Sequence, residues 1–185
     1  MNTVSEIASR YETVAAGFTA RLANVTSDQW SAPTPCSDWT VRELVAHVIG
    51  TQRGVSARLD PSQPVGVDLS ASLPEQWREA SHAVADAVND ETRAATVVGG
   101  MFGEQSFASL VGRLVCTDLL VHTWDLARAT GQDERLDADA VASSAQLLAS
   151  MDDAIRVPGG FAEKIVPSPG ADDQTRFLNF CGRAV

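Results

Sequence analysis

The segment CTDLLVHTWDLARATG, residues 116–131, places acidic and imidazole side chains where a helix would normally bury apolar ones. On a projection of about 100° per residue that starts at Phe107, leucine and valine side chains define the buried stripe of this helix. Asp118, His122 and Asp125 fall inside that stripe, at about 20°, 60° and 0°. Because burying an unpaired carboxylate is costly, these three groups must have partners that neutralise them.

Asp118 and His122 are four residues apart and therefore lie one turn apart on one helix face. This spacing lets two helix side chains bind one divalent ion, and a third ligand must then come from another helix. His47 borders the apolar side of its own predicted helix and is the natural third ligand. His82 lies about 140° from Trp77, off the apolar stripe, and is expected to be exposed. We therefore predict a metal site formed by His47, Asp118 and His122, with positions left open for water or substrate.

The same residues also allow other interpretations. A buried Asp–His pair can stabilise a core by hydrogen bonding without a metal ion. Asp125 is expected either to lie behind the metal ligands and accept a hydrogen bond from one of them, or to anchor one helix to another by a hydrogen bond. Two histidines and one carboxylate also form the iron site of non-haem oxygenases, but those sites usually lie on β-barrels, for which this sequence predicts no strands.

Helices are predicted to position these groups. Capping-box spacings predict that the first two helices begin after Thr3 and Thr40. Ser72, followed by Leu-Pro, predicts the start of the third. The helix with the polar stripe is predicted over about 105–129, a fifth helix follows Asp137 to about Ile155, and QTRFLNFC forms a short last helix. TVVGGMFGE must be a turn or a short hairpin.

The 185 residues are enough for one domain with its own core. We therefore predict that residues 1–185 form a single all-α domain, a four-helix bundle with an additional short C-terminal helix.

The composition excludes several classes of function. A net charge of −10 argues against nucleic acid as a partner. No apolar run approaches about 18 residues, so no membrane span is predicted. The N-terminus has acidic residues and lacks the apolar segment of a signal peptide, which predicts a cytoplasmic protein.

The three cysteines are far apart and form no C-x-x-C pair, so neither a disulfide framework nor a thiolate zinc site is predicted. Cys36 lies in a Pro-flanked loop before the helix of His47. It could be a nucleophile, but we expect an ordinary buried thiol. Trp30 and Trp39 flank this loop and are expected to pack it onto the bundle.

Two segments, PTPCSDWTVRELVAHVIG and DLLVHTWDLARATGQD, resemble the signature stretches of the DinB-like metal-binding superfamily. More narrowly, they resemble the group related to the N-terminal domain of mycothiol-dependent maleylpyruvate isomerase, and DDQTRFLNFCGR is similar to the usual ending of that group. The resemblance implies a four-helix bundle with one divalent metal ion, most commonly zinc. Its ligands would be a histidine of the second helix, here His47, and a pair spaced four residues apart, here Asp118 and His122.

This chain differs from the family pattern in two ways. Related members commonly carry Glu or His where this chain has Asp118. Because aspartate is shorter, the ion would have to sit closer to the helix. The isomerase itself also has a C-terminal domain that contributes to its active site, and this sequence is expected to lack it. The resemblance therefore does not extend to maleylpyruvate as the substrate.

Two functions fit this sequence. The first is a metal-dependent transferase or isomerase-like enzyme that activates a small thiol, mycothiol if the source organism makes it, against a small electrophile. The alternative is a non-catalytic metal-binding or ligand-binding bundle that acts as a sensor or interaction domain. The resemblance also implies possible homodimer formation through helix faces.

Overall fold

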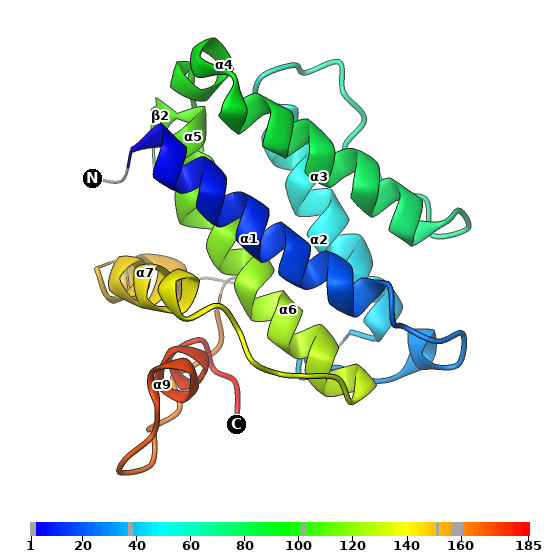
Figure 1. Cartoon of the computed structure of the whole chain (residues 1–185), viewed down its shortest axis with the longest axis vertical. Coiled ribbons are helices and arrows are strands. Elements are labelled where there is room, and N and C mark those ends of the chain that lie inside the picture. Colours follow the sequence, from blue (N-terminus) through cyan, green and yellow to red (C-terminus); the bar gives the residue numbers. More distant parts are fainter. Residues whose placement is uncertain (1–2, 37–38, 101–102, 151, 157–160) are drawn as a thin grey trace.

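The computed structural model describes residues 3–36, 39–100, 103–150, 152–156 and 161–185. Four long helices form the bundle (Figure 1), namely α1 (Val4–Leu22), α2 (Val41–Ser56), α3 (Leu73–Asn89) and α6 (Cys116–Thr130). α1 packs against α3 and α6, and α2 packs against the same two helices, so the four helices surround a common core. The all-α four-helix architecture expected from the sequence is confirmed.

The predicted helix starts are confirmed by the hydrogen bonds at three N-termini. Thr3 and Thr40 each form a complete capping box with the glutamate three residues later, and Ser72 accepts a hydrogen bond from the backbone of Glu75. At its other end, α6 stops at Gly131, whose φ of +65° is the left-handed conformation that glycine adopts without a Cβ clash. These local signals fix where α2 begins and where α6 ends, and thus help to position the polar side chains along the two helices.

The stretch predicted as one helix over 105–129 is interrupted. It consists of α5 (Phe107–Leu110), a π-helical turn at Val111–Val115 and α6. The amide of Cys116 donates to the carbonyl of Val111, five residues earlier, so this turn contains more residues than an α-turn. The prediction of a continuous helix was therefore wrong in this turn. Regular α-geometry resumes before Asp118, so the relative placement of the polar residues in α6 is unaffected.

The helix predicted from Asp137 to Ile155 is also divided, into α7 (Ala138–Ala149) and α8 (Asp152–Ile155), with residue 151 between them outside the described residues. The short C-terminal helix is present as α9 (Asp173–Phe180), which packs against α7 beside α6. Figure 1 shows α7 and α9 together on one side of the bundle. This arrangement brings the C-terminal end of the chain to α6.

The smaller elements complete the connections. A 3-10 turn (Gln29–Ser31) precedes α2, and α4 (Glu91–Ala95) follows α3. β1 (Val97–Val98) and β2 (Gln105–Ser106) pair antiparallel as the single short hairpin among the described residues. Residues 101–102 of the predicted turn lie outside those residues. The described chain contains no helix long and apolar enough to cross a membrane.

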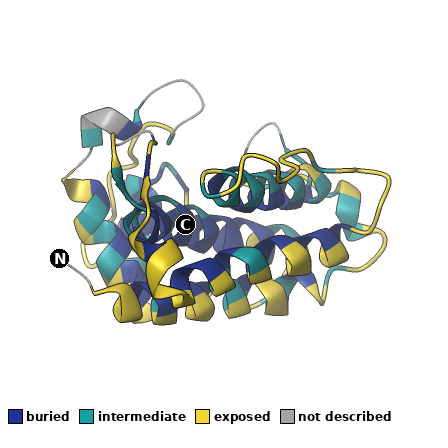
Figure 2. Cartoon of the chain, turned by 90° about the horizontal axis from the view of Figure 1, so that it is seen from above, coloured by how far each residue is buried: buried dark blue, intermediate teal, exposed yellow. Residues whose placement is uncertain are grey.

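Large side chains fill the centre of the bundle. Seen from above, the helices bury the faces that they turn toward one another and expose their outer faces (Figure 2). The largest fully buried side chains include two tryptophans, a tyrosine and three phenylalanines: Trp77, Trp124, Tyr11, Phe18, Phe107 and Phe177. α6 is buried on most of its sides because α1, α2 and α7 all pack against it.

The π-helical turn packs closely against α1, which yields a testable prediction. A Cβ atom added at Gly112 would lie 3.2 Å from Cγ1 and 3.3 Å from Cγ2 of Ile7. Gly112→Val should therefore lower the free energy of unfolding by about 1–3 kcal/mol through overpacking. Urea denaturation measures this change. The double variant with Ile7→Ala should lose less stability than the sum of the losses in the two single variants.

Gly54→Ala is the matched control, because a Cβ at this helical glycine of α2 would meet no atom within 4 Å. This substitution should raise stability by about 0.4–1 kcal/mol. A Gly112→Val variant as stable as the wild type would contradict the close packing of α1 on the π-helical turn.

Candidate metal centre

Three side chains from two facing helices converge at the polar stripe. His47 extends from α2, and Asp118 and His122 extend from α6. Oδ1 of Asp118 lies 3.4 Å from Nε2 of His47 and 3.4 Å from Nε2 of His122. The two imidazole rings meet edge to face, with centroids 4.9 Å apart. The structure thus brings together the three residues that the sequence predicted as metal ligands, whereas His82 is exposed on α3, as expected.

The spacing of these atoms is wider than a good hydrogen bond. N–H···O bonds most often have donor–acceptor distances near 2.9–3.0 Å. By contrast, ligand atoms about 2.1 Å from a tetrahedral zinc ion lie roughly 3.4 Å from one another. In addition, Oδ2 of Asp118 is buried without a hydrogen-bond partner. The donor set and the unpartnered oxygen therefore fit a cation shared by His47, Asp118 and His122.

The side chains of the cluster differ in their access to solvent. The exposed fraction is 35% for His47, 19% for Asp118 and 8% for His122. The cluster therefore opens toward solvent on the side of His47 and is closed at His122. A small molecule would approach it past His47.

Asp125 fixes the orientation of His122 from the opposite side of the ring. Its Oδ2 lies 2.9 Å from Nδ1 of His122, an ordinary hydrogen-bond distance, and its side chain is completely buried. When Nδ1 carries the proton of this hydrogen bond, Nε2 is directed at Asp118. A positive charge, either a second proton or a metal ion, must then lie between Nε2 and the carboxylate. Asp125 thus occupies one of the two positions expected from the sequence, directly behind a predicted ligand.

The cluster favours positive charge, as the pKa shifts of its members show. Burial opposes ionisation of Asp118, but the charge and hydrogen bond of His122 and the hydrogen bond of His47 hold the pKa of Asp118 well below its usual range. Burial alone would lower the pKa of His122, yet Asp118 and Asp125 raise it well above its ordinary value. A metal ion that binds here would displace that proton from His122.

Arg183 is a site residue that the sequence analysis missed. Its Nε lies 3.2 Å from Oδ1 of Asp125 and its Nη2 lies 2.8 Å from Oδ2, so the guanidinium grips the carboxylate at both oxygens. Burial opposes ionisation of Asp125, but the hydrogen bonds of His122 and Arg183 and the charge of Arg183 lower its pKa. Arg183 is the last residue of DDQTRFLNFCGR, the stretch that resembles the usual ending of the family, but nothing in that stretch indicates that its partner is Asp125.

Cys36 differs from the expectation of an ordinary buried thiol. It is only half-buried and has polar neighbours rather than an apolar environment. Nη2 of Arg183 donates to Sγ of Cys36 over 2.9 Å, and Sγ lies 3.4 Å from Oδ2 of Asp125 and 4.0 Å from Nδ1 of His122. The reason is that Cys36, in the loop before α2, lies against the middle of α6, where His122 and Asp125 lie. Residues 37–38 of this loop lie outside the described residues.

Trp39 forms an aromatic wall beside the imidazoles. Its ring centroid lies 4.5 Å from that of His47 and 5.8 Å from that of His122. The sequence predicted that Trp30 and Trp39 pack the loop onto the bundle, and both are packed against the core. Trp39 additionally restricts the ring of His47 and gives the open side of the cluster an apolar boundary.

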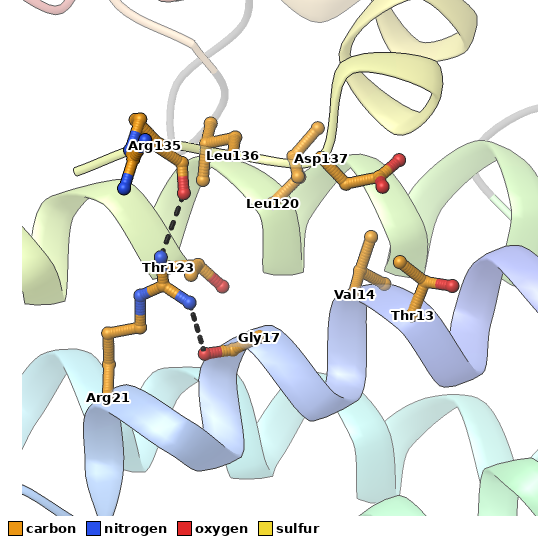
Figure 3. A pocket seen from close by; sticks show the side chains of 9 residues that line it. All are labelled: Thr13, Val14, Gly17, Arg21, Leu120, Thr123, Arg135, Leu136 and Asp137. Carbon is orange, nitrogen blue, oxygen red and sulfur yellow. Dashed lines mark hydrogen bonds between the residues drawn. The ribbon is translucent and has the colours of Figure 1, made fainter. Parts of the chain in front are cut away.

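A separate small pocket lies between α1, α6 and the connection to α7 (Figure 3). It has a volume of about 140 Å³, and its nine lining residues include none of the metal-centre cluster. The guanidinium of Arg21 donates to the carbonyl oxygens of Gly17, Asp133 and Arg135. These bonds join α1 to the segment after α6, so the polar groups beside the pocket have a structural role.

The chain is similar to known proteins over most of its length. Residues 11–127 match the family model described as the mycothiol maleylpyruvate isomerase N-terminal domain. That segment includes the three predicted ligands and Asp125 but not Arg183. Two relatives from Mycobacterium tuberculosis, Uncharacterized protein MT0763 (strain CDC 1551 / Oshkosh) and Uncharacterized protein Rv0738 (strain ATCC 25618 / H37Rv), are each 40% identical to the chain, covering 91% of it and 92% of their own length. No solved structure matches.

The burial of Asp125 leads to a prediction about stability. Asp125→Ala removes the carboxylate and leaves the guanidinium of Arg183 and Nδ1 of His122 buried without it. In protein treated with a chelator, the free energy of unfolding should fall by about 3–5 kcal/mol, as is typical when one partner of a buried ion pair is lost. Urea denaturation followed by circular dichroism measures the change.

The control is Asp173→Ala, which removes an aspartate that is 90% exposed and pairs only loosely with Arg176, at 3.8 Å. This change should cost less than about 1 kcal/mol. Equal effects of the two substitutions would show that Asp125 is not a buried partner of Arg183.

Proposed function

Because the chain belongs to the family of the mycothiol maleylpyruvate isomerase N-terminal domain, within the DinB-like superfamily, we propose that it binds a divalent metal ion and uses it to activate the thiol of mycothiol. The activated thiol would react with a small electrophile in a transferase or isomerase-like reaction. His47, Asp118 and His122 would hold the ion. The observation that carries this proposal is their convergence around Oδ1 of Asp118, with Oδ2 buried and unpartnered.

Zinc is the ion that this donor set suits best. Two imidazole nitrogens and one carboxylate are a common set of three protein ligands in catalytic zinc sites, which keep a further position open. Calcium and magnesium prefer oxygen ligands and are therefore less suited to a site with two imidazoles. The half-exposed His47 marks the side from which a further ligand could enter.

The chemistry divides between the ion and the residues of this chain. A divalent ion would supply Lewis acidity that lowers the pKa of a thiol, so that the thiol is nucleophilic at neutral pH. Asp118 would offset part of the ionic charge. Asp125 would keep Nε2 of His122 directed at the ion, and Trp39 would exclude water from one side of the opening. A small electrophile would approach past His47 and Trp39.

Substitutions of Asp118 test the metal site. Asp118→Asn should weaken zinc binding by at least about 10–100-fold while leaving the fold intact, because the amide keeps an oxygen but loses the charge. Asp118→Leu should abolish zinc binding and cost the chelator-treated protein little stability, because His122 can lose its proton once the carboxylate is gone and an apolar side chain fills the site. Competition with a chromophoric chelator and thermal melts with and without zinc measure both effects.

Asp173→Asn is the matched control and should change neither quantity, because Asp173 is exposed and distant from the cluster. The metal site would be rejected if neither zinc nor chelator changed the wild-type melting temperature while Asp118→Leu strongly destabilised the protein. That pattern would mean that Asp118 is a structural hydrogen-bond partner of His122.

A thiol assay separates the enzyme from a non-catalytic metal-binding bundle. Adding mycothiol to the cobalt-loaded protein should change the ligand-field spectrum, and the zinc-loaded protein should accelerate the reaction of mycothiol with members of a panel of small electrophiles. His47→Ala should remove both effects because it removes the ligand on the open side. His82→Ala, which changes an exposed histidine of α3, is the control. A protein that binds zinc tightly but shows neither effect would be a metal-binding bundle without thiol chemistry.

A further inference from the structure

We propose that Arg183 is a positioning residue for the metal centre, and that the C-terminal segment of the chain is needed to complete the site. Among the described residues, the guanidinium of Arg183 forms no hydrogen bond with the three predicted ligands, but it holds Asp125, which in turn holds His122. The inference rests on the proposed metal site and adds a residue that lies far from it in the sequence.

The contact between Arg183 and Asp125 is rigid because both oxygens of the carboxylate are engaged. Nε and Nη2 of the guanidinium contact Oδ1 and Oδ2, at 3.2 and 2.8 Å. The exposed fractions of the two side chains are 10% for Arg183 and 0% for Asp125. A planar guanidinium that grips a carboxylate in this way prevents it from rotating.

This rigidity passes to His122. Oδ2 of Asp125 is shared between Nη2 of Arg183 and Nδ1 of His122. With Oδ2 held in place, the hydrogen bond fixes the ring plane of His122 and therefore the direction of its Nε2 toward Asp118. Without Arg183, the buried carboxylate would lose its counter-charge and could turn away from the ring.

Backbone contacts near Arg183 place its guanidinium beside Asp125. The amide of Arg183 donates to the carbonyl of Leu178, and the side chain of Asn179 donates to the carbonyl of Arg183. Gly182 has a φ of +80°, and a Cβ there would lie only 2.7 Å from Cβ of Ala162. Only glycine fits this turn, which directs the next residue inward against α6.

Arg183 also reaches the loop that leads to His47. Its Nη2 donates to Sγ of Cys36, four residues before Thr40, the N-cap of α2. One guanidinium therefore contacts both the support of His122 on α6 and the segment that enters α2. This position explains how a residue at the end of the chain could set the distance between ligands of two helices.

Zinc affinity tests the proposal. Arg183→Gln should weaken zinc binding about tenfold, the lower end of the 10–100-fold range for groups that support a metal ligand. The ligand-field spectrum of the cobalt-loaded variant should also change. Arg176→Gln is the matched control, since it removes an arginine of α9 that is 57% exposed and lies 3.8 Å from Asp173. It should leave affinity and spectrum unchanged.

Two further variants separate positioning from folding. Arg183→Lys keeps the positive charge but cannot contact both carboxylate oxygens in the same way. Compared with Arg183→Gln, it should therefore recover more of the stability than of the zinc affinity. The double variant Arg183→Gln with Asp125→Asn leaves no uncompensated buried charge and should fold, yet bind zinc no more tightly than Arg183→Gln. Hydrogen exchange provides a reciprocal readout, because zinc should slow exchange of the amide of Arg183 in the wild type.

The outcomes distinguish this inference from the proposed function. If the wild type binds zinc and Arg183→Gln or Arg183→Lys binds it as tightly with the same cobalt spectrum, Arg183 does not position the site and only this inference fails. If the wild type does not bind zinc or cobalt, the proposed function fails and the inference fails with it. Weaker binding in both variants, with Arg176→Gln unaffected, supports the inference.

Discussion

The ion pair between Asp125 and Arg183 is the interaction on which the arrangement of the site depends. Both side chains are almost completely buried, and a buried pair of this kind rarely stabilises a fold more than apolar side chains of the same size would. Its presence is therefore better explained by what it holds in place. Through Oδ2 of Asp125 the pair fixes one face of His122, and through Nη2 of Arg183 it contacts the loop before α2. The loop before α2, the middle of α6 and the segment after α9 are thus tied together at this point.

This requirement also explains why α6 is an unusual core helix. It is surrounded by α1, α2 and α7, so every polar group on it needs a partner inside the protein. The bundle provides these partners by bringing the C-terminal segment back along α7 and α9, where Gly182 turns the chain inward. Two buried polar atoms of α6 have no hydrogen-bond partner among the described residues, Oδ2 of Asp118 and Nε1 of Trp124. The fold thus gives partners to the group that supports His122, whereas the carboxylate that faces the two ring nitrogens keeps one oxygen without a partner.

The sequence predicted what depends on local spacing. Capping residues located the starts of α1, α2 and α3, and the interval of four between Asp118 and His122 placed both on one face opposite His47. It did not predict contacts made between distant segments. Arg183 pairs with Asp125 across 58 positions and with Cys36 across 147, and no periodic pattern records such a contact. The π-helical turn was missed for a related reason: helical periodicity cannot distinguish a single wide turn from a regular one when apolar residues surround it.

The balance of charge in the cluster connects its geometry to its proposed chemistry. Arg183 neutralises Asp125, so this buried pair contributes no net charge to the site. Asp118 is then the one carboxylate left to face a cation, and two imidazoles bind as neutral ligands. A divalent ion held by His47, Asp118 and His122 would therefore leave one unit of positive charge at the site. A single anionic ligand would cancel that charge in a poorly solvated environment, whereas a neutral thiol would leave it uncompensated. The ion pair behind His122 thus does more than orient a ring. If Arg183 did not neutralise Asp125, the site would already be balanced and would offer a thiolate no electrostatic advantage.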